Sequence, residues 1–88
     1  MQQKTLLIEN SVGLHARPAA LMVQAAKKFN STIELRKGVK KANAKSITSI
    51  MQLAVKCGEE VEVIIEGSDE EEAMAYIEQL VKNKFGEV

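Results

Sequence analysis

Two different spacings of apolar residues follow each other in the first part of the chain. Residues 4–8 (KTLLI) form a short, partly β-branched apolar run that ends in a polar loop, which is typical of a strand. From residue 16 to residue 29 the apolar positions recur at i, i+3, i+4 and i+7, the spacing of one helical face. That face consists of Ala19, Met22, Val23, Ala26 and Phe29. The pattern predicts a strand and then a helix that ends at Asn30 and Ser31.

The middle of the chain predicts a hairpin, a short helix and another strand. Residues 32–37 (TIELRK) and 39–43 (VKKAN) are extended segments on either side of Gly38, as in a β-hairpin. A second helix is predicted to begin at Ser46 and to stop at residues 56–58, with an inner face of Ile50, Leu53 and Ala54. Residues 60–67 (EVEVIIEG) alternate between apolar and polar side chains, which indicates a strand with one buried face.

The last segment predicts a third helix. Ser68 and Glu71 have the spacing of a capping box, and acidic residues at 69–72 suit the positive start of a helix. Lys82 and Lys84 suit its negative end, and the buried stripe is predicted to be Ala73, Ile77, Leu80 and Val81. The order is therefore βαββαβα. Three amphipathic helices covering one face of a sheet form a two-layer α+β domain.

Composition narrows the class of protein. The 88 residues are 45% apolar and 27% charged, which is ordinary globular composition and predicts one domain spanning residues 1–88. We expect a cytoplasmic protein, because the N-terminus lacks the apolar core of a signal peptide and no segment is long and apolar enough to span a bilayer. The single cysteine, Cys57, has no partner for a disulfide and no neighbours with metal-ligand spacing, so neither a metal nor a cofactor is expected.

Charge is balanced in total and uneven along the chain. Twelve basic and twelve acidic residues cancel, which argues against a nucleic-acid-binding protein. Residues 36–45 carry five positive charges and no acid, whereas residues 59–72 carry eight acids and no base. Two interpretations remain open: an ordinary solvated surface, or a pair of charged regions that steer a partner.

The only histidine lies at a predicted helix start, within Gly13-Leu14-His15-Ala16-Arg17-Pro18. If His15 is the N-cap, the backbone amides of Ala16 and Arg17 have no acceptor inside the helix, and the missing N–H of Pro18 costs nothing. Free amides and the helix dipole form an anion site, and a guanidinium two residues beyond the imidazole can bind phosphate oxygens in bidentate fashion. An unprotonated imidazole nitrogen is a nucleophile, so this arrangement indicates phosphoryl transfer through His15. The alternative is a histidine that only caps the helix.

The segments GLHARPAA (13–20) and AKSI (44–47), together with the order βαββαβα, resemble the HPr family, the histidine-containing phosphocarriers of the bacterial phosphoenolpyruvate-dependent sugar phosphotransferase system. The resemblance implies an open-faced sandwich, with a four-stranded antiparallel sheet covered on one face by three helices. It implies that phosphorylated enzyme I loads His15 on Nδ1, that IIA domains of sugar permeases unload it, and that Arg17 contacts the phosphoryl group. The protein would thus be a carrier and not an enzyme. In Gram-positive-type members the serine matching Ser46 is phosphorylated by an HPr kinase/phosphorylase, and that form acts in catabolite regulation with catabolite control protein A.

Two positions depart from the family pattern. Val12 stands where many members have Ser, Thr or Asn, which removes a side-chain hydrogen bond that would steady the imidazole. Thr48 stands where a large apolar residue is frequent.

Helical geometry also predicts a surface for partners beside His15. On the first helix, Arg17 and three further residues lie opposite the buried stripe: Ala20, Leu21 and Gln24. Ile47, Thr48 and Met51 on the second helix would extend this surface. The alternative is that these apolar side chains are merely scattered on the surface, as in any globular protein.

Other classes of function fit the sequence less well. A regulatory HPr paralogue that acts mainly by protein–protein interaction is the main alternative, although it would have no need of His15. An RNA- or DNA-binding domain would lack aromatic side chains for stacking, since the chain has two Phe and one Tyr. An enzyme would lack a second catalytic group near His15 in the sequence. We therefore expect a monomeric carrier that binds proteins and neither nucleic acid nor membranes.

Overall fold

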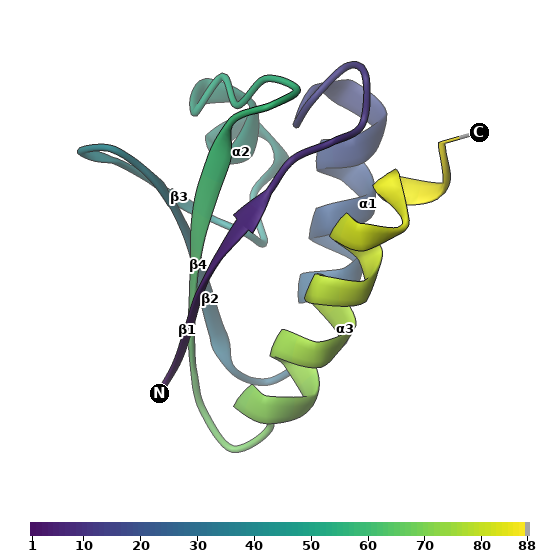
Figure 1. Ribbon diagram of the computed structural model, residues 1–88. Helices are drawn as coiled ribbons and strands as arrows, with labels where there is room; N and C mark the ends of the chain where they lie inside the picture. Colours follow the sequence, from purple (N-terminus) through teal and green to yellow (C-terminus); the bar gives the residue numbers. More distant parts are fainter. Residues whose placement is uncertain (88) are drawn as a thin grey trace.

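The computed structural model describes residues 1–87 and has the expected α+β architecture. Its elements in order are β1 (Gln2–Leu7), α1 (Ala16–Ala26), β2 (Thr32–Lys37), β3 (Lys40–Asn43), α2 (Ile47–Gln52), β4 (Glu60–Glu66) and α3 (Glu70–Lys82), followed by a short 3-10 turn at Lys84–Gly86. The strands form one antiparallel sheet in the order β1-β4-β2-β3. The helices lie on one side of this sheet, which confirms the predicted open-faced sandwich (Figure 1).

The alternation of β4 fixes which face of the sheet meets the helices. Val61, Val63 and Ile65 are buried, while the residues between them are partly or fully exposed. Ile65 pairs with Gln2 on β1 and with Ile33 on β2, so β4 lies inside the sheet. Helices and sheet bury one continuous apolar core between them, whose largest fully buried side chains include Ile8, Leu14, Met22, Leu35, Ile50 and Ile77. Leu14 belongs to this core, so His15 directly follows a core residue.

The first two helices are shorter than their apolar patterns predict. α1 ends at Ala26. The amide of Phe29 donates to the carbonyl of Ala26 at 3.2 Å, and a bond across three residues belongs to a tighter turn than that of an α-helix. Phe29 is only partly buried and makes an edge-to-face contact with Tyr76. The placement of Ala54 on the inner face of the second helix is wrong. Ala54 is exposed, because its φ of +53° is left-handed and ends the helical path after Leu53.

The predicted capping box at Ser68 and Glu71 is also wrong. α3 begins at Glu70 with Asp69 as N-cap, so Ser68 lies outside the helix. Glu70 fills the reciprocal role, since its Oε1 accepts a bond from the amide of Gly67 at 3.1 Å. The buried face of α3 shifts accordingly: Met74 joins Ala73, Ile77 and Val81, while Leu80 is only partly buried.

Candidate functional site

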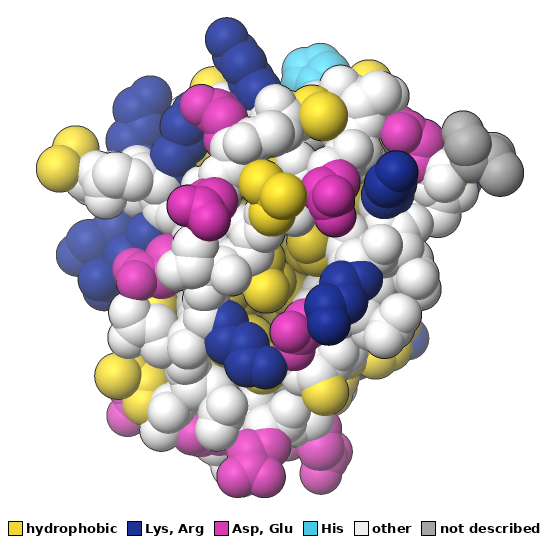
Figure 2. All heavy atoms as spheres, viewed as in Figure 1, with side chains coloured by type: hydrophobic (Ala, Val, Ile, Leu, Met, Phe, Trp, Pro, Cys, Tyr) yellow, Lys and Arg dark blue, Asp and Glu magenta, His cyan; other side chains and the backbone are white. Residues whose placement is uncertain are grey.

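His15 is the N-cap of α1, as the sequence predicts. Its backbone is extended, with φ −101° and ψ −170°, and its carbonyl accepts a bond from the amide of Ala19 at 2.8 Å. The imidazole makes no cap hydrogen bond and is exposed. Figure 2 shows the histidine protruding at one end of the molecule. The ring is therefore accessible to another protein.

The first turn of α1 offers unpaired donors beside the imidazole. Within residues 1–87, no acceptor bonds to the backbone amides of Ala16 and Arg17. Pro18 supplies no donor, and its ring is buried. Two amides at the positive end of a helix dipole form a suitable place for an anion next to His15.

The backbone before His15 is held by contacts with the loop after α2. Gly13 has a φ of +66°, and a Cβ atom there would lie 2.3 Å from the carbonyl oxygen of Val55. The next amide, that of Leu14, donates to the same carbonyl at 2.9 Å, and the Leu14 side chain is buried. Only glycine fits at position 13, so the chain enters α1 in one fixed direction.

Arg17 lines a pocket of about 300 Å³ beside the start of α1. The other lining residues are Asn10, Val12, Pro18, Lys84, Phe85, Gly86 and Glu87. Arg17 is exposed and forms no ion pair within the part of the chain that the structure describes, which leaves its guanidinium available for a ligand. Val12 is 57% exposed at the rim, so the residue that departs from the family pattern does not pack into the core.

Ser46 is the N-cap of α2, again as predicted. Its hydroxyl accepts a bond from the amide of Ser49 at 3.4 Å, and its side chain is partly exposed. The next residue, Ile47, is 41% exposed. A charge added to the Ser46 hydroxyl would therefore lie at the surface, next to an exposed apolar side chain.

The six residues predicted to form a partner surface all retain some exposure. Gln24, Ile47 and Thr48 are exposed, whereas Ala20, Leu21 and Met51 are intermediate. The surface is shared by two helices that pack against one another. α1 carries Ala20, Leu21 and Gln24, and α2 carries Ile47, Thr48 and Met51. Leu21 and Met51 also pack against the core, so their role is partly structural.

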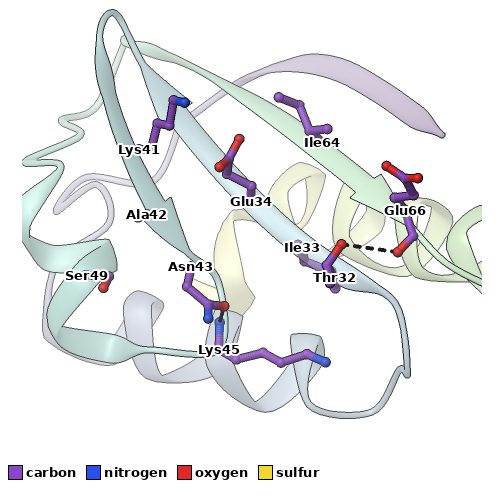
Figure 3. Close-up of a pocket in the computed structure, with 10 residues that line it drawn as sticks. All are labelled: Thr32, Ile33, Glu34, Lys41, Ala42, Asn43, Lys45, Ser49, Ile64 and Glu66. Atoms are coloured by element: carbon purple, nitrogen blue, oxygen red, sulfur yellow. Dashed lines mark hydrogen bonds between the residues drawn. The ribbon is translucent and has the colours of Figure 1, made fainter.

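The larger pocket, of about 480 Å³, is separate from the His15 segment and lies over β2 and β3 (Figure 3). Several of its polar side chains are already engaged. Thr32 Oγ1 donates to the carbonyl of Glu66 at 3.2 Å, and Lys45 Nζ donates to the carbonyl of Phe29 at 3.0 Å. Glu34 accepts from Arg36 Nε at 2.6 Å. Engaged side chains of this kind stabilise the sheet edge and give no reason to place the chemistry there.

One ion pair connects the basic and acidic segments within residues 1–87. Lys37 Nζ lies 2.9 Å from Glu59 Oε1 and lowers the pKa of that carboxyl group. This contact favours the interpretation of an ordinary surface for part of the basic segment. The unpaired cations near its hairpin tip include Lys40 and Lys41, within residues 1–87.

Three residues near the site have no clear signal in the sequence. Asn10 is buried and donates from Nδ2 to the carbonyl of Gly13 at 2.7 Å, yet in the sequence it resembles any polar loop residue. Ser11 and Glu87 are joined by hydrogen bonds across 76 positions of the chain, a separation that no local pattern reveals.

Within residues 1–87, no cluster of three His, Cys, Asp or Glu side chains could hold a metal ion. None of the described helices has the length and apolar character to span a membrane.

Comparison with known proteins identifies similar sequences and structures. Residues 2–83 match the family model described as PTS HPr component phosphorylation site. The chain is 49% identical to phosphocarrier protein HPr of Treponema pallidum over 99% of both chains. It superimposes on the crystal structure of HPr from Thermoanaerobacter tengcongensis with a TM-score of 0.97 and 52% identity, covering 100% of this chain and 99% of that one. It is also similar to the Bacillus subtilis catabolite repression protein Crh, whose crystal structure is described as a domain-swapped dimer, with 45% identity and a TM-score of 0.76 over 96% and 97% of the chains.

Proposed function

The chain belongs to the HPr family of phosphocarrier proteins, and from this we propose that His15 accepts a phosphoryl group from phosphorylated enzyme I and passes it to IIA domains of sugar permeases. The observation that carries the proposal is the exposed imidazole at the N-cap of α1, next to two unpaired amides and the free guanidinium of Arg17. Residues 1–88 would act as one phosphocarrier domain.

The proposed step transfers the phosphoryl group from enzyme I to one imidazole nitrogen of His15. The lone pair of the unprotonated imidazole nitrogen, Nδ1 in the family, attacks the phosphorus atom carried by enzyme I. The new N–P bond forms as the bond between phosphorus and the donor atom breaks, and that bond's electron pair returns to the donor. Arg17 and the amides of Ala16 and Arg17 stabilise the phosphoryl oxygens during the step. The second transfer, to a IIA domain, follows the same steps with His15 as the donor.

Ser46 is proposed as a second, regulatory phosphorylation site, recognised by an HPr kinase/phosphorylase. Its support is its position: a partly exposed hydroxyl at the start of α2, beside Ile47. A phosphate at a helix N-terminus interacts favourably with the dipole, so the fold tolerates it.

The second candidate function is that of a regulatory paralogue acting through catabolite control protein A. The similarity to Crh favours it, together with the capping position of Ser46. The intact His15 site favours the carrier, because regulation by binding alone has no use for a free nucleophile beside a guanidinium.

We further propose a cytoplasmic monomer that binds neither nucleic acid nor membranes. Because the similar Crh structure is a dimer, the solution mass has to be measured directly.

The decisive experiment is labelling with phosphoenolpyruvate and enzyme I. The parent chain and Ser46→Ala should both be labelled, and the label should be lost in acid, as phosphohistidine requires. His15→Ala should remain unlabelled while keeping its fold, since the imidazole makes no cap bond. Undiminished labelling of His15→Ala would overturn the proposed function. Subsequent incubation with IIA domains should remove the label from the parent.

A further inference from the structure

The chain turns back on itself after α3 in an unusual conformation. Lys84, Phe85 and Gly86 have φ values of +54°, +54° and +76°, three left-handed residues in succession. The left-handed region is costly for residues with a Cβ atom, and for a bulky side chain such as Phe it is an outlier. Phe85 is nonetheless only 5% exposed and lines the pocket with Pro18 of α1. Outliers of this kind persist where surrounding contacts hold them, and they cluster near functional sites.

The turn delivers the carboxylate of Glu87 to Ser11. The amide of Ser11 lies 3.0 Å from Oε1 and 3.1 Å from Oε2, and the Ser11 hydroxyl donates to Oε2 at 2.6 Å. These bonds lower the pKa of Glu87, so the carboxylate is ionised at neutral pH and is a strong acceptor. Figure 1 shows the C-terminal turn beside α1.

Ser11 lies in the turn that leads into His15. On its inner side the turn is held by the buried Asn10, whose Nδ2 donates to the carbonyl of Gly13, while the amide of Gly13 donates back to the carbonyl of Asn10 at 3.1 Å. On its outer side it is held by Glu87. His15 follows two residues after Gly13. The Glu87 contact therefore acts on the same backbone segment that the Leu14–Val55 hydrogen bond fixes before His15.

We infer that Glu87 is a positioning residue for His15 and acts through Ser11. This inference rests on the proposed function and adds a residue to it. The match to the family model ends at residue 83, so the segment that makes the contact lies outside the matched region. Small displacements of a reacting group lower transfer rates steeply, which gives the contact a measurable effect.

The test compares Glu87→Ala with Glu71→Ala. Glu71 is an exposed acid in the first turn of α3 and forms no side-chain hydrogen bond or ion pair within residues 1–87, so its removal controls for the loss of one negative charge. Three quantities are measured on each purified chain: the NMR positions of the His15 ring protons, the melting temperature, and the rate of phosphorylation at saturating enzyme I. The variants Ser11→Ala and Ser11→Ala/Glu87→Ala complete a double-mutant cycle.

For Glu87→Ala we expect displaced His15 ring signals and a saturating rate lower by about tenfold, with the apparent KM for the protein little changed. Glu71→Ala should match the parent. The double variant should be no slower than Glu87→Ala alone, because each single change already removes the same contact between Ser11 and Glu87. Unchanged His15 ring signals in Glu87→Ala would overturn the inference and reduce the contact to an anchor for the C-terminal turn. If enzyme I labels neither the parent nor any variant, the proposed function fails. The ring signals then still decide whether Glu87 positions His15.

Discussion

The carboxylate of Asp69, at the start of α3, accepts hydrogen bonds from both the amide and the hydroxyl of Ser31, which lies 38 positions earlier in the loop between α1 and β2. The amide of Asn30 donates to the same carboxylate at 2.8 Å. Ser31 is one of only two buried polar residues among those the structure describes, and a Cβ at the neighbouring Gly67 would clash with it. One side chain thus joins the loop between α1 and β2 to the start of α3.

The Ser31 contact predicts acid sensitivity. Hydrogen bonds from Ser31, and then from Asn30, lower the pKa of Asp69 below its ordinary value of 3.8. A carboxyl group with a depressed folded-state pKa stabilises the fold fully above its unfolded pKa and loses that contribution as the pH falls through the folded value. Asp69→Asn should therefore lower the melting temperature by about 5 °C at pH 7. The difference from the parent should shrink below pH 4, and a constant difference between pH 2 and pH 7 would contradict the assignment.

Gly13→Ala should destabilise the fold more than Gly38→Ala. Both glycines are left-handed, with φ values of +66° and +60°, but only at Gly13 would the new Cβ meet a backbone carbonyl. The clash adds to the conformational cost, so we expect a loss of about 2–4 kcal/mol for Gly13→Ala and about 1 kcal/mol for Gly38→Ala. Urea unfolding of the two variants measures both values. Equal losses would mean that the loop before His15 yields easily.

Arg17→Ala should slow phosphorylation without preventing it, because the guanidinium stabilises charge and forms no bond to phosphorus. A reduction of about tenfold to hundredfold is expected, with stability unchanged within about 0.5 kcal/mol, since Arg17 is exposed. Arg17→Lys should recover part of the rate. The control is Lys84→Ala, which removes the other cation that lines the pocket. If both alanine variants slow the reaction equally, the general positive charge matters and Arg17 has no special role.

Local patterns predicted the order of the elements and the N-cap position of His15. The alternation of Val61, Val63 and Ile65 fixed a strand, and Pro18 three residues after His15 marked a helix start, because each signal depends only on neighbours in the chain. The two errors, at Ala54 and at Ser68, both concern where a helix ends or begins. Nothing near Asp69 shows that its carboxylate is occupied by Ser31, and nothing near Ala54 shows a left-handed residue.

The same limit applies to the candidate site itself. His15, Arg17 and Ser46 were predicted because a motif carries them. Glu87 was not, since it forms its hydrogen bonds with Ser11, near the other end of the sequence. Exposure could be predicted only roughly: helical geometry placed Leu21 in solvent, whereas it packs partly against the core.

Ile47→Glu tests the proposed partner surface. Ile47 is 41% exposed, so a charge there should cost little stability while weakening the complex with enzyme I by about tenfold or more. Val39→Glu is the matched control, since Val39 is 97% exposed at the β2–β3 hairpin tip. Isothermal titration gives both affinities. Equal weakening by the two variants would point to long-range charge effects, and no weakening by Ile47→Glu would remove this residue from the interface.

Ser46→Asp tests regulation by charge at the start of α2. Aspartate is as good an N-cap as serine, so its carboxylate can accept the bond from Ser49 that the hydroxyl accepts now. Negative charge at a helix start is favourable as well, and stability should stay within about 1 kcal/mol of the parent. Ser46→Ala is the control, because it removes the hydroxyl and adds no charge. Thermal unfolding of both variants establishes that the fold is retained before any kinetic comparison.

The kinetic effect of Ser46→Asp should depend on salt. The added charge lies next to Ile47, within the proposed partner surface, so it opposes docking against an acidic or apolar face of enzyme I. The Debye length, over which a charge acts before salt screens it, is about 30 Å at 0.01 M salt and about 3 Å at 1 M. A charge effect must therefore be large at low ionic strength and small at high ionic strength. Loading of His15 should thus be slowed most at low salt, while Ser46→Ala follows the parent throughout. A slowing that is the same at both salt concentrations would instead indicate a steric effect of the longer side chain, and the charge mechanism would then be abandoned.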